Sequence, residues 1–375
     1  MTTELFINPR FERDKVYGAK EKAILSVAAG EEARAAISKW PGYAPTPLRS
    51  LDQLAKDTGV AAIHYKDEDA RFVTKSFKAM GGAYAVERLA REANGKPLTV
   101  TCATDGNHGR AVAWGAQRAG IKAVIFIHEG VSEGRAEAIR SFGAEVRREG
   151  KHYDDSVRRA AEVAAENGWQ IVSDTSWPGY QDVPKLVMQG YALLAAESLD
   201  QGTAPTHVFV QGGVGGLAAG VLSWFWEKQG AQRPKTIVVE PDRAACLLAS
   251  AKAGALKNAD GDLETIMAGL ACGEASAIAW DILEHGADAF MAIPDDAAAD
   301  TMRKLAEYGV VGGESGVAGL AGFRIAAKDP AMRAALGLDA SSRILAIGTE
   351  GDTDPVVYRE IVGTTGEEIR KKRAA

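Results

Sequence analysis

Short apolar runs alternate with helical segments along most of this chain, and this alternation restricts the fold more than any other feature. Strands are predicted at residues 61–65, 99–103, 124–127, 169–172, 206–211, 236–239 and 344–347. Helices are predicted at residues 76–93, 132–142, 154–167 and 183–198, and another runs through Trp114 and Ala119. Strands that are apolar on both faces and separated by single helices form parallel sheets. The sequence therefore predicts an α/β fold with open, mostly parallel sheets flanked by helices.

Length and composition allow two lobes and favour a small polar ligand over nucleic acid. The chain has 375 residues, of which 46% are hydrophobic and 25% charged, so it can bury a large core. Its 44 Lys and Arg against 50 Asp and Glu give a net charge of -6, without the basic excess of a nucleic-acid-binding domain. The first residues contain no basic segment followed by an apolar one, and no stretch approaches the ~18 apolar residues of a membrane span. We expect a cytoplasmic protein with no membrane partner.

The three cysteines, Cys102, Cys246 and Cys272, fit neither a disulfide framework nor a C-x-x-C metal site, so no metal is expected. Cys246 and Cys272 are 26 positions apart and flank a connection rich in Gly, Ala and Asp. A disulfide could close that loop, although a reducing cytosol opposes it. The sequence leaves this question open.

One lysine stands next to a glycine pair at the opening of a predicted helix, in the segment Ser76-Phe77-Lys78-Ala79-Met80-Gly81-Gly82-Ala83-Tyr84, with Ser76 as the expected N-cap. A lysine amine is a nucleophile only when it is neutral, and a pKa near 10.4 leaves about one molecule in a few thousand neutral at pH 7. Attachment to an aldehyde as a Schiff base, or burial, removes this obstacle. Taken alone, the segment is more typical of a solvated lysine beside a Gly-Gly turn.

A glycine-rich loop follows the strand predicted at 206–211 and precedes an apolar helix, with the sequence Gly212-Gly213-Val214-Gly215-Gly216. Exposed backbone N–H groups at a helix N-terminus bind phosphate, so we expect an anion site here. The pattern Gly213-x-Gly215-x-x-Ala218 also fits a dinucleotide fingerprint, with Glu240 as the acid that binds the ribose. That alternative leaves the Lys78 segment without a role.

A second polar loop, Thr104-Asp105-Gly106-Asn107-His108-Gly109, lies between a predicted strand and a predicted helix. Asn107 offers both a donor and acceptors, and Asp105 places a carboxylate at the strand end. Helix capping by either residue is the structural alternative. For His108, packing at the helix start is the favoured interpretation.

Together, these three segments resemble in order and spacing the pyridoxal-phosphate enzymes of the tryptophan synthase β / threonine dehydratase superfamily, which have fold type II. Within it, the chain is similar to the diaminopropionate ammonia-lyase family. Features of that family appear in the segments 76–84 and 104–109 and also at Asp174-Thr175-Ser176-Trp177-Pro178-Gly179-Tyr180 and Thr349-Glu350-Gly351-Asp352-Thr353-Asp354-Pro355. The resemblance runs through nearly the whole chain, and several motifs in order are more specific than any one of them.

The resemblance implies a role for each motif in binding pyridoxal 5′-phosphate. Lys78 would form the Schiff base with this cofactor, and Asn107 would hydrogen-bond the 3′-oxygen of its ring. Thr349 would face the ring nitrogen, although a shift of one place would put Gly348 there. A neutral hydroxyl leaves the pyridine unprotonated, which suits β-elimination better than transamination. The cofactor phosphate would lie in the glycine loop formed by Gly212, Gly213, Val214, Gly215 and Gly216.

The resemblance also implies a two-lobed enzyme. We expect a larger lobe from residues 1–85 and 195–375 and a smaller, mobile lobe from residues 86–194, with the cofactor in the cleft between them. A homodimer is expected, and the substrate carboxylate is expected to bind in the loop 104–109.

Most dehydratases of the superfamily carry a serine where this chain has Asp105. Once the substrate has replaced Lys78 on the cofactor, this lysine can take the α-proton from one face, while a carboxylate on the opposite face can take it from the mirror-image substrate. We therefore expect activity toward both D and L isomers, with Lys78, Asp105 and Asp174 as catalytic residues.

The carboxylates of Asp105 and Asp174 would also attract an ammonium group on the β-carbon of the substrate. At 4 Å and an effective dielectric near 20, each contact is worth roughly 4 kcal/mol before desolvation. The same charges would repel a β-carboxylate. The expected reaction is therefore α,β-elimination of 2,3-diaminopropionate to pyruvate and two ammonia molecules. For Asp174, an Asx-turn before Thr175 is the structural alternative.

Three other functions stay open at the level of sequence. The first is a serine or threonine dehydratase of the same superfamily. The second is a nicotinamide-dependent oxidoreductase, which the dinucleotide pattern allows. The third is an amino-acid sensor that binds a ligand on the same scaffold without catalysis.

Overall fold

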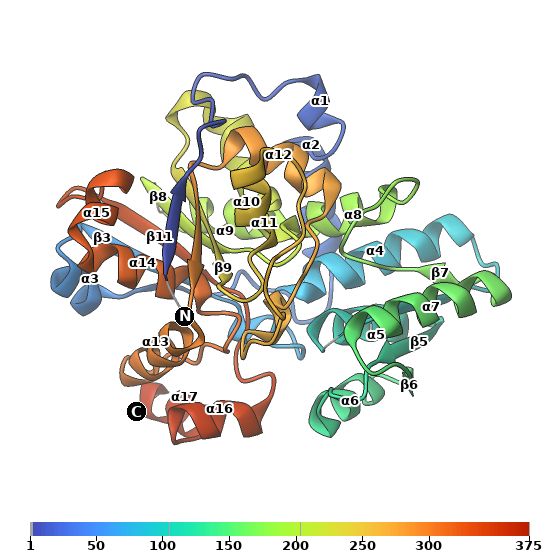
Figure 1. Cartoon of the computed structure of the whole chain (residues 1–375). Helices are drawn as coiled ribbons and strands as arrows, with labels where there is room; N and C mark the ends of the chain where they lie inside the picture. Colours follow the sequence, from blue (N-terminus) through green and yellow to red (C-terminus); the bar gives the residue numbers. More distant parts are fainter. Residues whose placement is uncertain (1–2, 105, 203, 375) are drawn as a thin grey trace.

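The computed structural model describes residues 3–104, 106–202 and 204–374, whose strands form two separate sheets (Figure 1). The larger sheet has the strand order β1-β10-β9-β8-β11-β3-β2. Its strands are β1 (Glu4–Ile7), β2 (Leu48–Ser50), β3 (Ala62–Asp67), β8 (His207–Gln211), β9 (Lys235–Pro241), β10 (Ala289–Ile293) and β11 (Arg343–Gly348). The smaller sheet has the order β6-β5-β4-β7, with β4 (Thr99–Ala103), β5 (Lys122–Ile127), β6 (Glu145–Arg148) and β7 (Gln170–Ile171).

Helices surround both sheets. Those before the second sheet and around it are α1 (Ala19–Lys22), α2 (Val27–Ile37), α3 (Asp52–Thr58), α4 (Lys78–Ala93), α5 (Asn107–Ala119), α6 (Glu133–Arg140), α7 (Tyr153–Asn167), α8 (Asp182–Tyr191) and α9 (Leu193–Asp200). The later ones are α10 (Gly216–Gln229), α11 (Cys246–Ala253), α12 (Ala277–Gly286), α13 (Asp295–Glu307), α14 (Ala318–Lys328), α15 (Pro330–Leu336), α16 (Pro355–Val362) and α17 (Gly366–Ala374).

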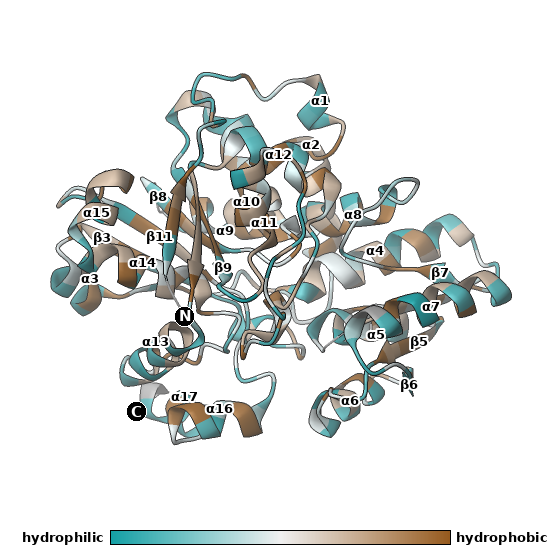
Figure 2. Cartoon of the chain, in the orientation of Figure 1, coloured by the Kyte–Doolittle hydropathy of each residue, from teal (hydrophilic) through white to brown (hydrophobic). Residues whose placement is uncertain are grey.

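The interior of the larger sheet is parallel, and its edge strands β1 and β2 are antiparallel. Strand β8 is buried along its whole length and is apolar on both faces. Val208 and Val210 belong to the core on one side of the sheet, and Phe209 belongs to the core on the other, where its ring packs on Phe323 of α14. Figure 2 shows the hydrophobic residues concentrated on the strands and hydrophilic residues on outer helices such as α7. The α/β fold with mostly parallel, helix-flanked sheets is confirmed.

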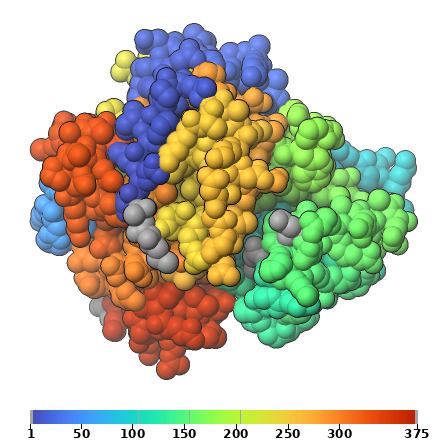
Figure 3. Space-filling view, viewed as in Figure 1, coloured from blue at the N-terminus to red at the C-terminus, as the bar shows by residue number. Residues whose placement is uncertain are grey.

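The smaller sheet lies with α5, α6 and α7 on the right of Figure 1. Its strands lie within residues 99–171 and pair in parallel, whereas the strands of the larger sheet lie outside residues 86–194. In the space-filling view, these teal and green residues occupy one side of the molecule and meet the yellow, orange and red residues along one line (Figure 3).

Helix α4 joins the two regions by close packing that only small residues permit. A Cβ atom on Gly190 of α8 would lie 2.0 Å from the carbonyl oxygen of Met80, and one on Gly82 would lie 3.0 Å from the Cβ atom of Ala111 in α5. Contacts this short exclude a side chain at Gly190. The glycines therefore fix the position of α4, whose first residue is Lys78.

Most predicted elements are confirmed, with corrections at their ends. The helix predicted at 183–198 is interrupted at Ala192, although the N–H of Ala192 still donates to the carbonyl of Met188 at 3.1 Å. Ser76 is not the N-cap of α4, because the helix begins one residue later, after Phe77. Strands β1, β2, β6 and β10 were not predicted.

Two further features concern the expectations about cysteines and membranes. Cys102, Cys246 and Cys272 are free thiols in the structure, so no disulfide closes the connection between the last two. None of the helices in the described ranges combines the length and apolar character that a bilayer span requires.

Candidate active site

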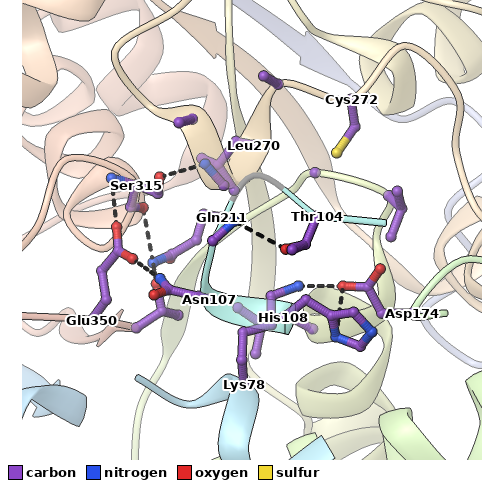
Figure 4. A pocket seen from close by; sticks show the side chains of 18 of the residues that line it. Lys78, Thr104, Asn107, His108, Asp174, Gln211, Leu270, Cys272, Ser315 and Glu350 are labelled. Carbon is purple, nitrogen blue, oxygen red and sulfur yellow. Dashed lines mark hydrogen bonds and ion pairs between the residues drawn. The ribbon is translucent and has the colours of Figure 1, made fainter. Parts of the chain in front are cut away.

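A pocket lies where strands of both sheets end (Figure 4). Thr104 follows β4, Asp174 follows β7, Gln211 ends β8 and Thr349 follows β11. In open parallel sheets the carboxyl ends of the strands are where ligands bind. The lining includes Lys78, Thr104, Gly106, Asn107, His108, Arg135, Asp174, Tyr191, Gln211, Gly213, Val214, Gly215, Gly216, Cys272, Glu314, Ser315, Thr349 and Glu350.

Lys78 begins α4 and points its amine into this pocket, where it forms an ion pair with Asp174. Its side chain is 17% exposed, so it is not the solvated lysine of the alternative interpretation. Burial by itself lowers the pKa of the amine, but the charge and the hydrogen bond of Asp174 outweigh burial and raise the pKa of Lys78 above its ordinary value. Conversely, burial raises the pKa of Asp174, but the charge and the hydrogen bond of Lys78 outweigh burial and bring this pKa below its usual range.

His108 lies beside this ion pair. Its Nε2 donates to the carbonyl oxygen of Val172 at 2.8 Å, and its Nδ1 is 3.8 Å from a carboxylate oxygen of Asp174. Burial lowers the pKa of His108, which favours the neutral ring. The packing and backbone contact agree with the structural interpretation made from the sequence. The N–H of Ser176, which an Asx-turn at Asp174 would engage, donates to Ser276 Oγ at 3.1 Å. The Asp174 carboxylate therefore serves Lys78 rather than an Asx-turn.

The glycine loop presents backbone to the pocket. Gly213, Val214, Gly215 and Gly216 line it, and α10 begins at Gly216. Gly215 has φ of +96°, a conformation that favours glycine. A Cβ atom on Gly213 would lie 3.1 Å from the sulfur of Cys272. The N-terminus of α10 is therefore accessible to an anion. Gly212 has a different role, because it packs against Leu247 and is not part of the lining.

Glu240 does not fit the dinucleotide alternative. Its carboxylate is fully buried and accepts the N–H groups of Leu247 and Leu248, each at 2.8 Å, at the start of α11. Burial raises the pKa of Glu240 to about 8. Because both oxygens of this buried side chain accept N–H groups at the start of α11, Glu240 is not available to bind a ribose hydroxyl.

The loop at 104–109 places Asn107 at the first position of α5. Gly106 is the N-cap, so Asn107 does not cap the helix, and its Nδ2 donates to Glu350 instead. Asp105 lies outside the described residues.

Thr349 is 3% exposed, and its Oγ1 accepts a hydrogen bond from Gln211 Nε2 at 2.9 Å. Since this bond uses the oxygen as an acceptor, the hydroxyl proton of Thr349 stays available for donation. Gly348, the alternative, is within β11, and a Cβ atom there would lie 2.0 Å from the ring of Tyr65. Thr349 lines the pocket and Gly348 does not.

Several lining residues were not predicted from the sequence, and they come from distant segments. Glu314 and Ser315 belong to the Gly312–Ser315 segment, which is not part of any motif identified in the sequence. One oxygen of Glu314 accepts from Arg135 at 2.9 Å, while burial and the neighbouring charge of Glu350 raise the pKa of Glu314 to about 8. Glu350 lies within the motif at 349–355, but nothing in its spacing indicated a contact with Asn107.

Comparison with known proteins agrees with this geometry. Residues 39–350 match the protein family described as "Pyridoxal-phosphate dependent enzyme". The chain belongs to this family. It is 40% identical to diaminopropionate ammonia-lyase of Escherichia coli strain K12, over 93% of this chain and 95% of the relative. The enzyme of the same name from Salmonella typhimurium is also 40% identical, over 93% of this chain and 96% of the relative. The crystal structure of the Escherichia coli enzyme in complex with D-serine superposes with a TM-score of 0.90 at 38% identity, covering 96% of this chain and 97% of that chain.

The pocket fits the cofactor of the pyridoxal-phosphate dependent family. Lys78 supplies an amine for the aldehyde. This amine is buried and, among the described residues, forms an ion pair with Asp174. The backbone of Gly213 to Gly216 lies in the same pocket and suits a phosphate. Thr349 and Asn107 line the same pocket and supply hydrogen-bond donors. The donor set therefore matches an aromatic aldehyde that carries a phosphate.

Replacing Asp174 with asparagine is expected to shift cofactor uptake by the apoprotein to lower pH. Only a neutral amine attaches to the aldehyde, and the Asp174 charge holds the pKa of Lys78 up. Without that charge, burial lowers the pKa, so the neutral fraction at a given pH rises. The midpoint of the uptake rate against pH should fall by at least about one unit, measured from the visible absorbance after mixing.

Asp352→Asn is the matched control for this experiment. Asp352 pairs with Lys75 at 3.0 Å and does not line the pocket. Its replacement should leave the uptake midpoint unchanged. An unchanged midpoint in Asp174→Asn would show that Asp174 does not control the protonation of Lys78.

Proposed function

We propose that this protein is a diaminopropionate ammonia-lyase, which eliminates 2,3-diaminopropionate of either configuration to pyruvate and two ammonia molecules. The observation that carries the proposal is the Lys78–Asp174 pair, which lines the same pocket as the glycine loop. The 40% identity to the Escherichia coli enzyme of that name, along 93% of this chain, supports the substrate class.

Pyridoxal phosphate, when bound, supplies an aldehyde for amine attachment and a ring that accepts electrons. Lys78 would hold the cofactor through its amine, and with substrate bound in its place the neutral amine would take the α-proton of the L isomer at Nζ. Asp105 takes the α-proton of the D isomer from the opposite face. The β-amino group leaves as ammonia, and water hydrolyses the released enamine to pyruvate and a second ammonia.

Asp174 has a second role that follows from its pairing. In the described state its carboxylate is engaged by the charged amine of Lys78. When that amine is neutral, as it has to be to act as a base, the carboxylate can turn to the β-ammonium group of the substrate. A cationic leaving group beside a fixed anion is favoured over the neutral hydroxyl of serine.

Asn107 and Thr349 orient the ring in this proposal. Asn107 would donate to the 3′-oxygen. The hydroxyl proton of Thr349, which its bond from Gln211 leaves available, would be donated to the ring nitrogen. A neutral partner keeps this nitrogen unprotonated, which makes the ring a milder electron sink suited to elimination.

Two lobes that move relative to each other are also part of the proposal, with residues 1–85 and 195–375 as the larger lobe and 86–194 as the smaller. Arg135 of α6 supports this division, since it reaches from the smaller sheet region to Glu314 at 2.9 Å and to Asp354 at 3.3 Å. Such contacts at the pocket can open when the smaller lobe moves. We further propose a cytoplasmic homodimer.

Substrate profiling tests the function. Ammonia release is measured with D- and L-diaminopropionate, serine and threonine at equal concentrations, and kcat/KM should be at least about 10²-fold higher for diaminopropionate, which equals about 3 kcal/mol of discrimination. A preference for serine or threonine would instead identify a dehydratase. Binding of these amino acids without release of any keto acid would identify a sensor.

A further inference from the structure

Glu350 lies beside the pocket with both carboxylate oxygens engaged (Figure 4). The residue is 4% exposed. Its Oε1 accepts the N–H of Ser315 at 3.0 Å. Its Oε2 accepts from Nδ2 of Asn107 and, at 3.4 Å, from Oγ1 of Thr353. These contacts fix the carboxylate in one orientation.

The backbone around Glu350 leaves room for this side chain. A Cβ atom on Gly313 would lie 2.8 Å from Cγ of Glu350, and one on Gly316 would lie 3.0 Å from the same atom. The N–H of Gly313 donates to the carbonyl oxygen of Glu350 at 3.0 Å. The Gly312–Ser315 segment therefore serves to hold Glu350. Neither the sequence of this segment nor the motif at 349–355 reveals that role by itself.

The contact with Glu350 determines how the amide of Asn107 is turned. A carboxylate only accepts hydrogen bonds, so the nitrogen of the amide has to face it. If the amide turned over, its oxygen would face the carboxylate, acceptor against acceptor. Nδ2 carries a second hydrogen, and Asn107 lines the pocket, so this hydrogen is available to a ligand there.

We infer that Glu350 is a positioning residue that holds Asn107 with an N–H directed at the 3′-oxygen of the cofactor. The inference rests on the proposed function, in which Asn107 contacts that oxygen. Glu350 acts through Asn107, while its neighbour Thr349 faces the ring nitrogen. The Thr349-Glu350 dipeptide thus controls the orientation of the ring at two of its atoms.

Glu350→Gln is the direct test, performed on the full-length protein with pyridoxal phosphate. Glutamine offers one acceptor oxygen to two donors, Ser315 N–H and Asn107 Nδ2, so Asn107 loses its fixed orientation. A 3′-oxygen without its donor keeps its proton, and the bound cofactor should then absorb less in the visible and more in the near ultraviolet. The dissociation constant of the cofactor should rise roughly tenfold.

Glu314→Gln is the matched control, because Glu314 is also a buried glutamate in the pocket lining. Its replacement should leave the ratio of the two absorption bands near that of the wild type. An equal change in both variants would overturn the inference, since it would reflect only the replacement of a buried glutamate in the pocket lining. Glu350→Asp keeps both acceptor oxygens and should restore part of the visible band. If Glu350→Gln does not fold, Glu350→Asp provides the test by itself. A complete loss of the visible band in Glu350→Asp would count against the inference.

Asn107→Ala separates this inference from the function on which it rests. If Glu350 acts through Asn107, the double variant Asn107→Ala/Glu350→Gln should show the same bands and cofactor affinity as Asn107→Ala alone. Additive effects would overturn the positioning role. If Asn107→Ala changes the bands and Glu350→Gln does not, the inference fails while the assignment of Asn107 stands. If Asn107→Ala changes nothing, both fail.

Discussion

Replacing Lys78 with alanine is expected to abolish covalent attachment of the cofactor and to lower kcat for diaminopropionate by at least about 10⁴-fold. Lys78 supplies both the amine that attaches and the base that takes the α-proton. It is the lysine among the described lining residues, and it is held by Asp174 inside the pocket. Mass spectrometry after borohydride reduction measures attachment, and ammonia release measures turnover.

Lys75→Ala is the control for this prediction. Lys75 lies three positions earlier, is 38% exposed and pairs with Asp352 outside the pocket. The wild type and Lys75→Ala should gain the mass of the reduced cofactor on the peptide that contains Lys78, and Lys78→Ala should not. A reduced cofactor attached to any other residue would contradict the assignment of Lys78 as the Schiff-base lysine.

Asp105→Asn is expected to separate the two isomers of the substrate. An amide takes no proton, so turnover of D-diaminopropionate should fall by about 10²- to 10⁴-fold. Turnover of L-diaminopropionate should fall by less than about tenfold, since Lys78 remains as its base. The two chain neighbours of Asp105, Thr104 and Gly106, line the pocket. The measurement is kcat for ammonia release from each pure isomer.

Asp174→Asn provides the comparison for the stereochemical prediction. Asp174 pairs with Lys78 and is proposed to hold the β-ammonium group, which both isomers carry. Its replacement should therefore lower the turnover of both isomers to a similar degree. Similar losses of D and L turnover in Asp105→Asn would contradict a base on the opposite face.

Local pattern predicted much of the fold. Runs such as 124–127 and 344–347 are apolar on both faces, and such runs are stable only between helices, which is why the parallel sheets could be predicted. Two of the missed strands lack this signal: β2 has three residues, and β6 is polar with both of its ends exposed, whereas β10, which is apolar and buried throughout, carries it. The break at Ala192 was missed because no proline or glycine stands at that position.

The same limit applies to the site. Motif reasoning selected Lys78, Asn107, Asp174, the glycine loop and Thr349, and the structure places all of them around one pocket, except that Gly212 packs behind the loop. It did not select Gln211, Glu314 or Glu350. These residues take their roles from partners more than 100 positions away, such as Thr349 for Gln211 and Asn107 for Glu350.

The sequence by itself determined which chemical groups are present and in which order: one lysine at a helix start, a loop able to bind phosphate, and polar residues at strand ends. Helix starts, tight turns and apolar periodicity are local properties, so neighbouring residues are enough to specify them. Only the tertiary structure decided which of these groups meet. The ion pair of Lys78 with Asp174 spans 96 positions, and the bond from Asn107 to Glu350 spans 243. Their geometry depends on how two sheets pack across one pocket, which no local pattern encodes.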